Sequence, residues 1–275
     1  MLYILLTALI LVFSLWLIPL LLFRPSNDRN WSKDQAVLPF AEINGNRVHI
    51  KNIRNFTYRT TTDYTPGYYD RTFDLDKIKQ VYYVVEPFSR FAGAAHTFLS
   101  FEFEDDQYVS ISAEIRKEAG EEFSPLKGLF RQFEMMYVIA DERDVIKLRT
   151  NYRHDPVYLY PGKRVSKERL QKLFLSMIRE ANRLYTTPEF YNTITNTCAT
   201  TIVRHINEIA GDRIGLSYTI LLPGYSDKLA YKLGLLDTEL PLDEIRNHFQ
   251  VNSRAIKYAD SPDFSKWIRR YDLKE

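Results

Sequence analysis

The only cysteine of this 275-residue chain, Cys198, follows a stretch rich in Asn and Thr at positions 192–197. The apolar spacing after it predicts a helix with Asn196 as its N-cap, so the thiol would lie in the first turn. Unpaired backbone N–H groups and the helix dipole stabilise an anion there, which lowers a cysteine pKa. Cys198 is therefore a candidate nucleophile, and the alternative is a small buried side chain without a chemical role.

A histidine that could activate this thiol is predicted on a strand over residues 94–103. Alternate residues of a strand point to opposite faces, so the histidine shares its face with an aromatic and two polar side chains. The residues of this face are His96, Phe98, Ser100 and Glu102. Small residues precede the histidine, which leaves room beside its ring. A lone histidine on a strand can also be purely structural.

A second strand, predicted over residues 108–115, forms a hairpin with the first after two consecutive aspartates. Ser112 and Glu114 are polar positions on one face of this strand, close enough to reach His96. A thiol, a histidine and a group that orients the histidine are the parts of a cysteine nucleophile site. We assign Glu114 as the orienting residue, and Ser112 or Glu102 are the alternatives.

Three residues near this constellation are assigned to substrate binding, namely Asn196, Ser112 and Arg116. No cluster of Cys and His has the spacing of zinc ligands, and no glycine-rich phosphate loop is found, so we expect no metal and no cofactor. The 37 basic and 35 acidic residues are interleaved and leave a net charge of +2. This pattern gives no basic stripe, so we expect no nucleic acid partner.

The first 23 residues are predicted to be a membrane anchor. Residues 2–23 are apolar apart from Thr7 and Ser14, and about 20 such residues span the hydrocarbon of a bilayer. Residues 24–40 then read as a polar linker. The basic residues of this linker, considered alone, would keep the globular part in the cytoplasm by the positive-inside rule.

The remaining pattern predicts a mixed α+β domain. Strands are expected at 47–53, 81–86, 134–140 and 157–160, a short helix at 125–132, and a long helix that Ser166 caps. Residues 58–74 are expected to be an irregular loop, and His205 a surface group. We assign residues 41–215 to the catalytic domain and residues 216–275 to a helical C-terminal extension packed on it.

The order of the candidate residues resembles a circularly permuted papain-like or NlpC-like domain, because the histidine strand precedes the cysteine helix. Lecithin retinol acyltransferase and related lipid-handling enzymes are similar in this respect. The resemblance is closer to a bacterial domain family named for the periplasmic domain of Lnb lipoprotein N-acyltransferases. The blocks that carry it are RNFTYR at 54–59, AHTFLSF at 95–101, ISAEIRKE at 111–118, FRQFE at 130–134, ADERDV at 140–145, LRTNYR at 148–153 and TNTCAT at 195–200.

This resemblance implies an antiparallel sheet packed on helices, with Cys198 as the acyl-accepting nucleophile and His96 as the base. It also implies the periplasmic side of a bacterial inner membrane, with the domain held by one transmembrane helix. The expected function is transfer of a fatty acyl group from phospholipid to an amine such as a lipoprotein amino terminus. Thr197 stands where relatives often have Asn, which leaves the oxyanion donors to the backbone. The alternatives are a cell-envelope cysteine peptidase or amidase and a non-catalytic binding module.

Overall fold

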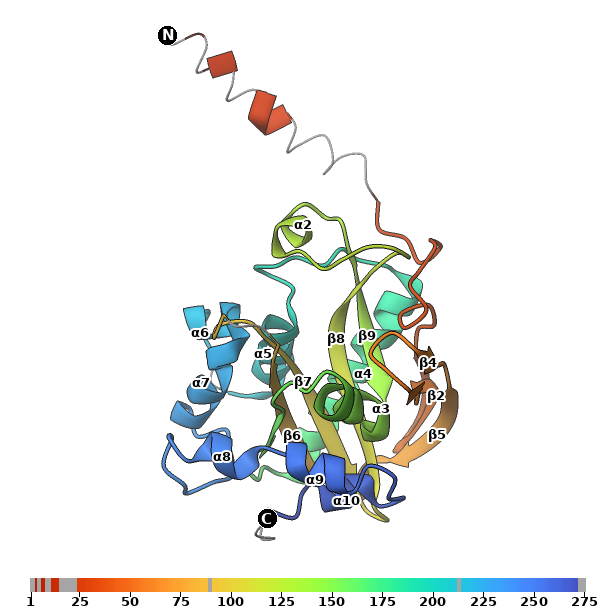
Figure 1. Cartoon of the computed structure of the whole chain (residues 1–275), viewed down its shortest axis with the longest axis vertical. Helices are drawn as coiled ribbons and strands as arrows, with labels where there is room; N and C mark the ends of the chain where they lie inside the picture. The colour runs from red at the N-terminus through yellow and green to blue at the C-terminus, as the bar shows by residue number, and fades with distance from the viewer. Residues whose placement is uncertain are drawn as a thin grey trace.

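The computed structural model of this chain describes residues 3, 6–7, 11–14, 24–88, 91–211 and 214–271 (Figure 1). Most of the predicted membrane anchor at 1–23 therefore lies outside the described residues. Within the described ranges, no helix combines the length and the apolar character that crossing a membrane requires.

The chain folds as the mixed α+β domain that its pattern predicts. The strands are β1 (Phe40–Asn44), β2 (Arg47–Arg54), β3 (Thr57–Tyr58), β4 (Tyr64–Thr65), β5 (Tyr68–Asp74), β6 (Ile78–Pro87), β7 (Ala95–Phe103), β8 (Gln107–Arg116), β9 (Glu134–Ala140) and β10 (Tyr158–Pro161). The helices are α2 (Pro125–Leu129), α3 (Glu142–Lys147), α4 (Lys167–Thr186), α5 (Cys198–Ile209), α6 (Tyr218–Leu221), α7 (Ser226–Lys232), α8 (Ile245–Phe249), α9 (Asn252–Lys257) and α10 (Phe264–Trp267). Two short 3-10 helices are η1 (Leu75–Lys77) and η3 (Pro223–Tyr225), and η2 (Leu148–Tyr152) is a π-helical segment.

One sheet forms the centre of the molecule, with the strand order β1-β2-β9-β8-β7-β6-β10 and with β5 paired to β2. Its pairs are antiparallel except for the parallel contact of β2 with β9. The prediction of an irregular loop at 58–74 is wrong, because this segment contains β4 and β5. Most positions of β5 are partly exposed, so the strand lacks the apolar alternation that reveals a strand in sequence.

The two faces of the sheet are covered by different helices (Figure 1). Phe101 of β7 packs with Phe174 of α4 in one core, to which α5 also contributes. Phe98 of the same strand packs in a second core with residues of α3, α9 and α10, including Phe264. The predicted alternation of faces along this strand is therefore confirmed.

The C-terminal segment from residue 216 onward is packed on the sheet and contributes to the second core and to a third apolar cluster. Besides α9 and α10 on one face, α7 and α8 lie against the edge formed by β6 and β10. The carboxylate of Asp227 in α7 is fully buried, accepts a hydrogen bond from Tyr160 at 3.0 Å and pairs with Arg246 at 2.7 Å. These contacts join the extension to the edge strand.

The sheet parts between β7 and β8. The two strands pair from Leu99 and Ile111 to Phe103 and Gln107, next to a tight turn whose two aspartates have positive φ. Toward the other end, β7 stays paired with β6 as far as Ala95, and β8 stays paired with β9. Beyond Leu99 and Ile111 the two strand pairs are no longer hydrogen bonded to each other, and α5 contacts both β7 and β8. Residues 95–98 and 112–116 therefore face each other without ladder pairing.

The segment at 24–40, predicted to be a linker, lies along the domain. Arg116 at the end of β8 is almost fully buried and donates to the carbonyl oxygens of Gln35 and Ala36 at 2.9 and 2.8 Å and to the side chain of Asn27 at 2.9 Å. Its guanidinium also stacks on Trp31, 4.1 Å from the ring centroid. Arg116, which the sequence analysis assigns to substrate binding, thus directs its donors to this segment.

We predict that Arg116→Ala lowers the free energy of unfolding by about 2 kcal/mol, because several acceptors lose a charged donor at once. Urea unfolding followed by circular dichroism measures the change. Arg164→Ala is the matched control, because the Arg164 side chain is 89% exposed. Equal unfolding midpoints for Arg116→Ala and the wild type would show that the guanidinium does not hold the segment.

Candidate active site

The helix that carries the cysteine starts at the thiol itself. α5 begins at Cys198, and its N-cap is Thr197 instead of the predicted Asn196. Thr197 and Thr200 form a capping box, in which Thr200 N donates to Thr197 Oγ1 at 3.2 Å and Thr197 N donates to Thr200 Oγ1 at 2.7 Å.

 The backbone N–H groups of Cys198 and Ala199 have no acceptor within the helix, because of their place in its first turn.

The histidine reaches the thiol at the place where the sheet parts. The His96 ring and the Cys198 thiol are neighbours, and each shifts the pKa of the other. The Nε2 atom of His96 lies 2.7 Å from Ser112 Oγ and 3.4 Å from Glu114 Oε1, across the gap between β7 and β8. Ser112 Oγ in turn donates to Glu114 Oε1 at 3.0 Å. The structure thus brings together Cys198, His96, Ser112 and Glu114, all of which the sequence analysis selected.

Electrostatics favour an ion pair in this group. Burial would raise the pKa of the Cys198 thiol, but the hydrogen bond and the charge of His96, with help from Thr97, lower it below its ordinary value of 9.0. Burial would lower the pKa of His96, but its interactions with Cys198 and Glu114 raise it to about 9. The shared proton therefore prefers the imidazole, which gives a thiolate beside an imidazolium.

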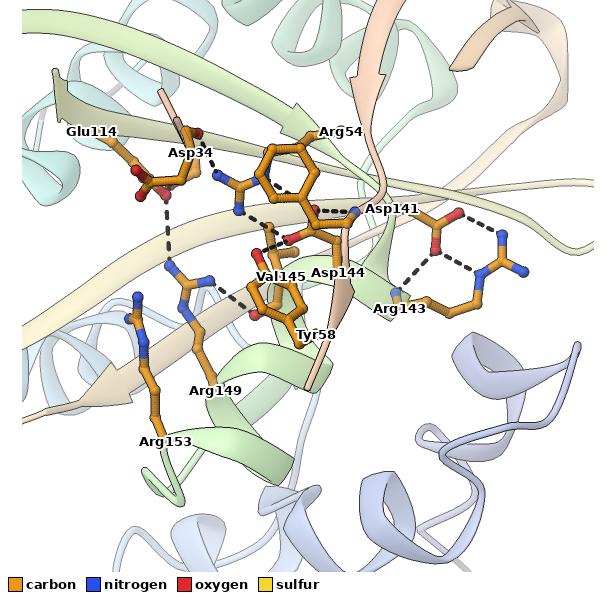
Figure 2. Close-up of polar contacts among 12 residues, drawn as sticks. Asp34, Arg54, Tyr58, Glu114, Asp141, Arg143, Asp144, Val145, Arg149 and Arg153 are labelled. Carbon is orange, nitrogen blue, oxygen red and sulfur yellow. Dashed lines mark hydrogen bonds and ion pairs between the residues drawn. The ribbon is translucent and has the colours of Figure 1, made fainter. Parts of the chain in front are cut away.

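Glu114 is the charge that stabilises the imidazolium. Burial would raise the pKa of this carboxyl, but His96 and the guanidinium of Arg149 hold it far below its usual range. Arg149 lies 3.5 Å from Glu114 Oε1 (Figure 2). Its guanidinium also stacks on Phe98, 5.1 Å from the ring centroid. It also forms a buried ion pair with Glu86. The positive charge of Arg149, which Glu86 balances, therefore helps to keep the Glu114 carboxylate ionised.

A neighbouring buried pair fixes the elements that hold Arg149. Arg54 of β2 donates twice to Asp144 of α3, at 3.0 and 3.1 Å (Figure 2). Asp144 also accepts hydrogen bonds from the backbone of Phe56 at 2.8 Å and from Tyr58 at 3.1 Å. With four hydrogen bonds, the carboxylate is fully satisfied although it is completely buried. This pair anchors the helical turns from which Arg149 extends.

Two residues beside the sulfur were not selected from the sequence. Thr97 lies beside Cys198, and its backbone and side chain help to lower the thiol pKa. Tyr83 of β6 lies close enough for the charge of Cys198 to raise its pKa, which burial raises as well, and its hydroxyl donates to Ser226 at 2.6 Å. No sequence signal indicated either residue, because alternation places Thr97 on the opposite face of the strand from His96.

Two other assignments lie outside the hydrogen-bonded group. The side chain of Asn196, assigned to substrate binding, donates to Glu189 at 2.9 Å. Glu102, the alternative orienting residue, accepts from Tyr82 at 2.8 Å and pairs with Lys79 at 2.5 Å. Of the three candidates for the orienting residue, Ser112 makes the hydrogen bond to the His96 ring, and Glu114 places a carboxylate 3.4 Å from the same nitrogen. Asn196 serves the turn that leads into α5.

The prediction that His205 is a surface group is wrong. Its side chain is 2% exposed and lies between α4 and the sheet. One ring nitrogen is 2.6 Å from the hydroxyl of Tyr137, and the other is 2.6 Å from that of Ser176. Helix α5 is covered on two sides, by the sheet and by α4, so its buried face is wider than the apolar stripe suggests.

The arrangement has the parts needed for nucleophilic catalysis by a thiolate. The sulfur has a partner that can hold and return a proton, and the backbone N–H groups at the start of α5 could stabilise an oxyanion. The hydroxyl of Thr197 is engaged in the capping box. Among the described residues, no group of three or more His, Cys, Asp or Glu side chains is arranged to hold a metal ion.

We predict that His96→Gln slows alkylation of Cys198 by iodoacetamide at pH 7 at least about tenfold, because the thiol loses its proton acceptor and its pKa rises. The rate measured against pH should have its midpoint below 9 in the wild type and at a higher pH in the variant. His49→Gln is the control, because His49 contacts Thr72 on the far strands β2 and β5. Identical rate profiles for the wild type and His96→Gln would show that His96 does not activate the Cys198 thiol.

We also predict that Glu114→Gln moves the pKa of His96 from about 9 toward 6.5, because the imidazolium loses the neighbouring negative charge. Titration of the His96 ring by NMR measures this shift, with the resonance assigned from its absence in His96→Gln. Between pH 7 and 8.5 the ring should remain protonated in the wild type and become neutral in Glu114→Gln. An unchanged midpoint would remove Glu114 from its assigned role.

The comparisons with known proteins address the family of the chain. A family model described as the Lnb N-terminal periplasmic domain matches residues 64–247. The matched span covers more than half of the chain and includes Cys198, His96 and Glu114. No curated protein and no solved structure matches the chain. By its match to this model, the chain belongs to the Lnb N-terminal periplasmic domain family.

Proposed function

We propose that this chain is a thiol acyltransferase of the cell envelope, which accepts a fatty acyl group on Cys198 and passes it to an amine. The observation that carries the proposal is that His96 lies beside Cys198 at the start of α5, with Ser112 and Glu114 in contact with its ring. A buried cysteine without a chemical role needs no such partner, and the carboxylate of Glu114 behind the ring adds a charge that only a protonated histidine uses.

In the first half of the proposed reaction, the Cys198 thiolate attacks the carbonyl carbon of an acyl ester. The tetrahedral oxyanion would be held by the backbone N–H groups of Cys198 and Ala199. When the carbon–oxygen bond breaks, the alcohol that leaves takes the proton from the His96 imidazolium. The products are a thioester on Cys198, a neutral His96 and the free alcohol.

In the second half, an amine attacks the thioester carbonyl. Neutral His96 accepts a proton from the attacking amine, and the thiolate leaves as the amide forms. The enzyme returns to the starting ion pair. Since Cys198 is only 9% exposed, little water can reach the thioester, which favours an amine acceptor over hydrolysis.

The proposed substrates are a phospholipid as acyl donor and a lipoprotein amino terminus as acceptor. Membership of a periplasmic domain family supports a location in the periplasm. The proposal includes a single anchor at residues 1–23 that holds the domain at the inner membrane, because a tethered enzyme meets lipid esters at high effective concentration. In this proposal, membership of the periplasmic family outweighs the basic residues at 24–33, which favour the opposite orientation by the positive-inside rule.

A circularly permuted papain-like fold is part of the same proposal. The histidine strand β7 precedes the cysteine helix α5 along the chain, and the start of the helix lies against the sheet where β7 and β8 part. This order and this contact support the permuted arrangement. A cysteine peptidase or amidase would use the same residues with water as the acceptor.

The direct test is the mass of the protein after incubation with phospholipid vesicles. We predict that the wild type gains the mass of one fatty acyl group, located on Cys198 and removed by hydroxylamine, which cleaves thioesters. Cys198→Ala should gain nothing, and His96→Gln should gain it at least about a hundredfold more slowly, within the usual range for loss of general acid–base catalysis.

Ser100→Ala serves as the control for this experiment, because Ser100 is on the face of His96 but bonds to Glu142 of α3. Its acylation should match that of the wild type. An unmodified cysteine together with release of stem peptides from cell wall would favour the peptidase. An unmodified cysteine with no release would favour a binding module.

A further inference from the structure

A groove of about 750 Å³ lies along the helix that carries Cys198. It is bounded by α5, by the first half of α4, by β6 and β7, and by α7 from the C-terminal segment. Most of its wall is apolar, for example Val81, Leu99, Leu173, Ile202, Ile206 and Leu229. Its volume is within the range of small-molecule sites in proteins.

The groove starts beside the nucleophile. Ala199, the residue after Cys198, belongs to its wall, and so does Tyr83, whose ring lies close to the sulfur. From Ala199 the wall continues along α5 as far as Ile209, which corresponds to about 15 Å of helix. The groove is thus elongated, and one of its ends is formed by Ala199, the residue next to Cys198.

The polar groups of the groove are at its ends. Near the thiol, the hydroxyls of Tyr83 and Ser226 bond to each other at 2.6 Å. At the opposite end, beyond the C-terminus of α5, Lys163, Arg164 and Arg169 line the opening. The stretch between the two ends is therefore suited to a ligand that is long, narrow and without hydrogen-bonding groups.

We infer that this groove is the acyl-chain subsite, which holds a straight fatty acyl chain with its carbonyl carbon at Cys198 and its methyl end toward Ile209. The inference rests on the proposed function and adds to it the length and shape of the group transferred. The same acyl chain occurs in phospholipids and in the diacylglyceryl group of lipoproteins, so the groove alone fits either donor.

The inference is tested by filling the groove in the full chain. Ile206→Trp places a larger side chain in the middle of the groove, away from the thiol. With p-nitrophenyl esters as donors, acylation of Cys198 by the palmitoyl ester should slow at least about tenfold in this variant, the effect of losing about two buried methylenes. Acylation by the acetyl ester should stay within about twofold of the wild type, because the acetyl group does not reach Ile206.

Ile256→Trp is the matched control, because Ile256 of α9 is 56% exposed and α9 packs against the other face of the sheet. It should leave both esters unaffected. Equal loss with the acetyl and palmitoyl esters in Ile206→Trp, or no loss with either, would overturn the subsite. If no ester acylates Cys198 even in the wild type, the proposed function itself fails.

A binding measurement keeps the subsite testable apart from the chemistry. Cys198→Ser should bind a fluorescent long-chain fatty acid, and the double variant with Ile206→Trp should bind it at least about tenfold more weakly. Equal binding by the two would overturn the subsite. In the acylation assay, labelling from phosphatidylglycerol vesicles identifies phospholipid as the donor, and labelling from a diacylated lipopeptide alone identifies lipoprotein.

Discussion

The parting of β7 from β8 is the constraint on which the site depends. A sheet that opens in its centre leaves backbone groups without ladder partners, and buried polar groups need partners. Here Thr97 lies beside Cys198, and Ser112 and Glu114 reach across to His96. These side-chain contacts join the two strands where ladder pairing ends, so formation of the candidate site and the packing of the sheet are coupled.

Placing Glu114 in this gap requires positive charge behind it. Arg149 supplies that charge, and its own guanidinium is balanced by Glu86. Breaking a buried pair by removing one partner typically costs about 3–5 kcal/mol, whereas an intact pair adds little to stability. The charges around the site are therefore better explained by the need to hold an ionised carboxylate beside His96 than by a contribution to folding.

Local patterns in the sequence were sufficient for much of this description. The strand 134–140 and the helix capped by Ser166 have the predicted positions, because each combines a clear period with a clear boundary signal. The candidate site could be predicted for the same reason, since alternation along one hairpin places His96, Ser112 and Glu114 on the same face. Arg149, the burial of His205 and the strands after Tyr58 were not predictable, because each depends on a partner that is distant in the chain.

The segment at 24–40 follows the surface of the domain as a stem instead of a loose tether. Arg116 holds it at Asn27, Gln35 and Ala36, and Arg29 pairs with Glu134 at 2.8 Å. A bound stem fixes the direction in which the chain leaves the domain at residue 24. If residues 1–23 anchor the chain in a membrane, this fixed exit sets how the entrance to the thiol is oriented toward the bilayer as well as its distance from it. Lengthening the segment would change that orientation before it changed the distance.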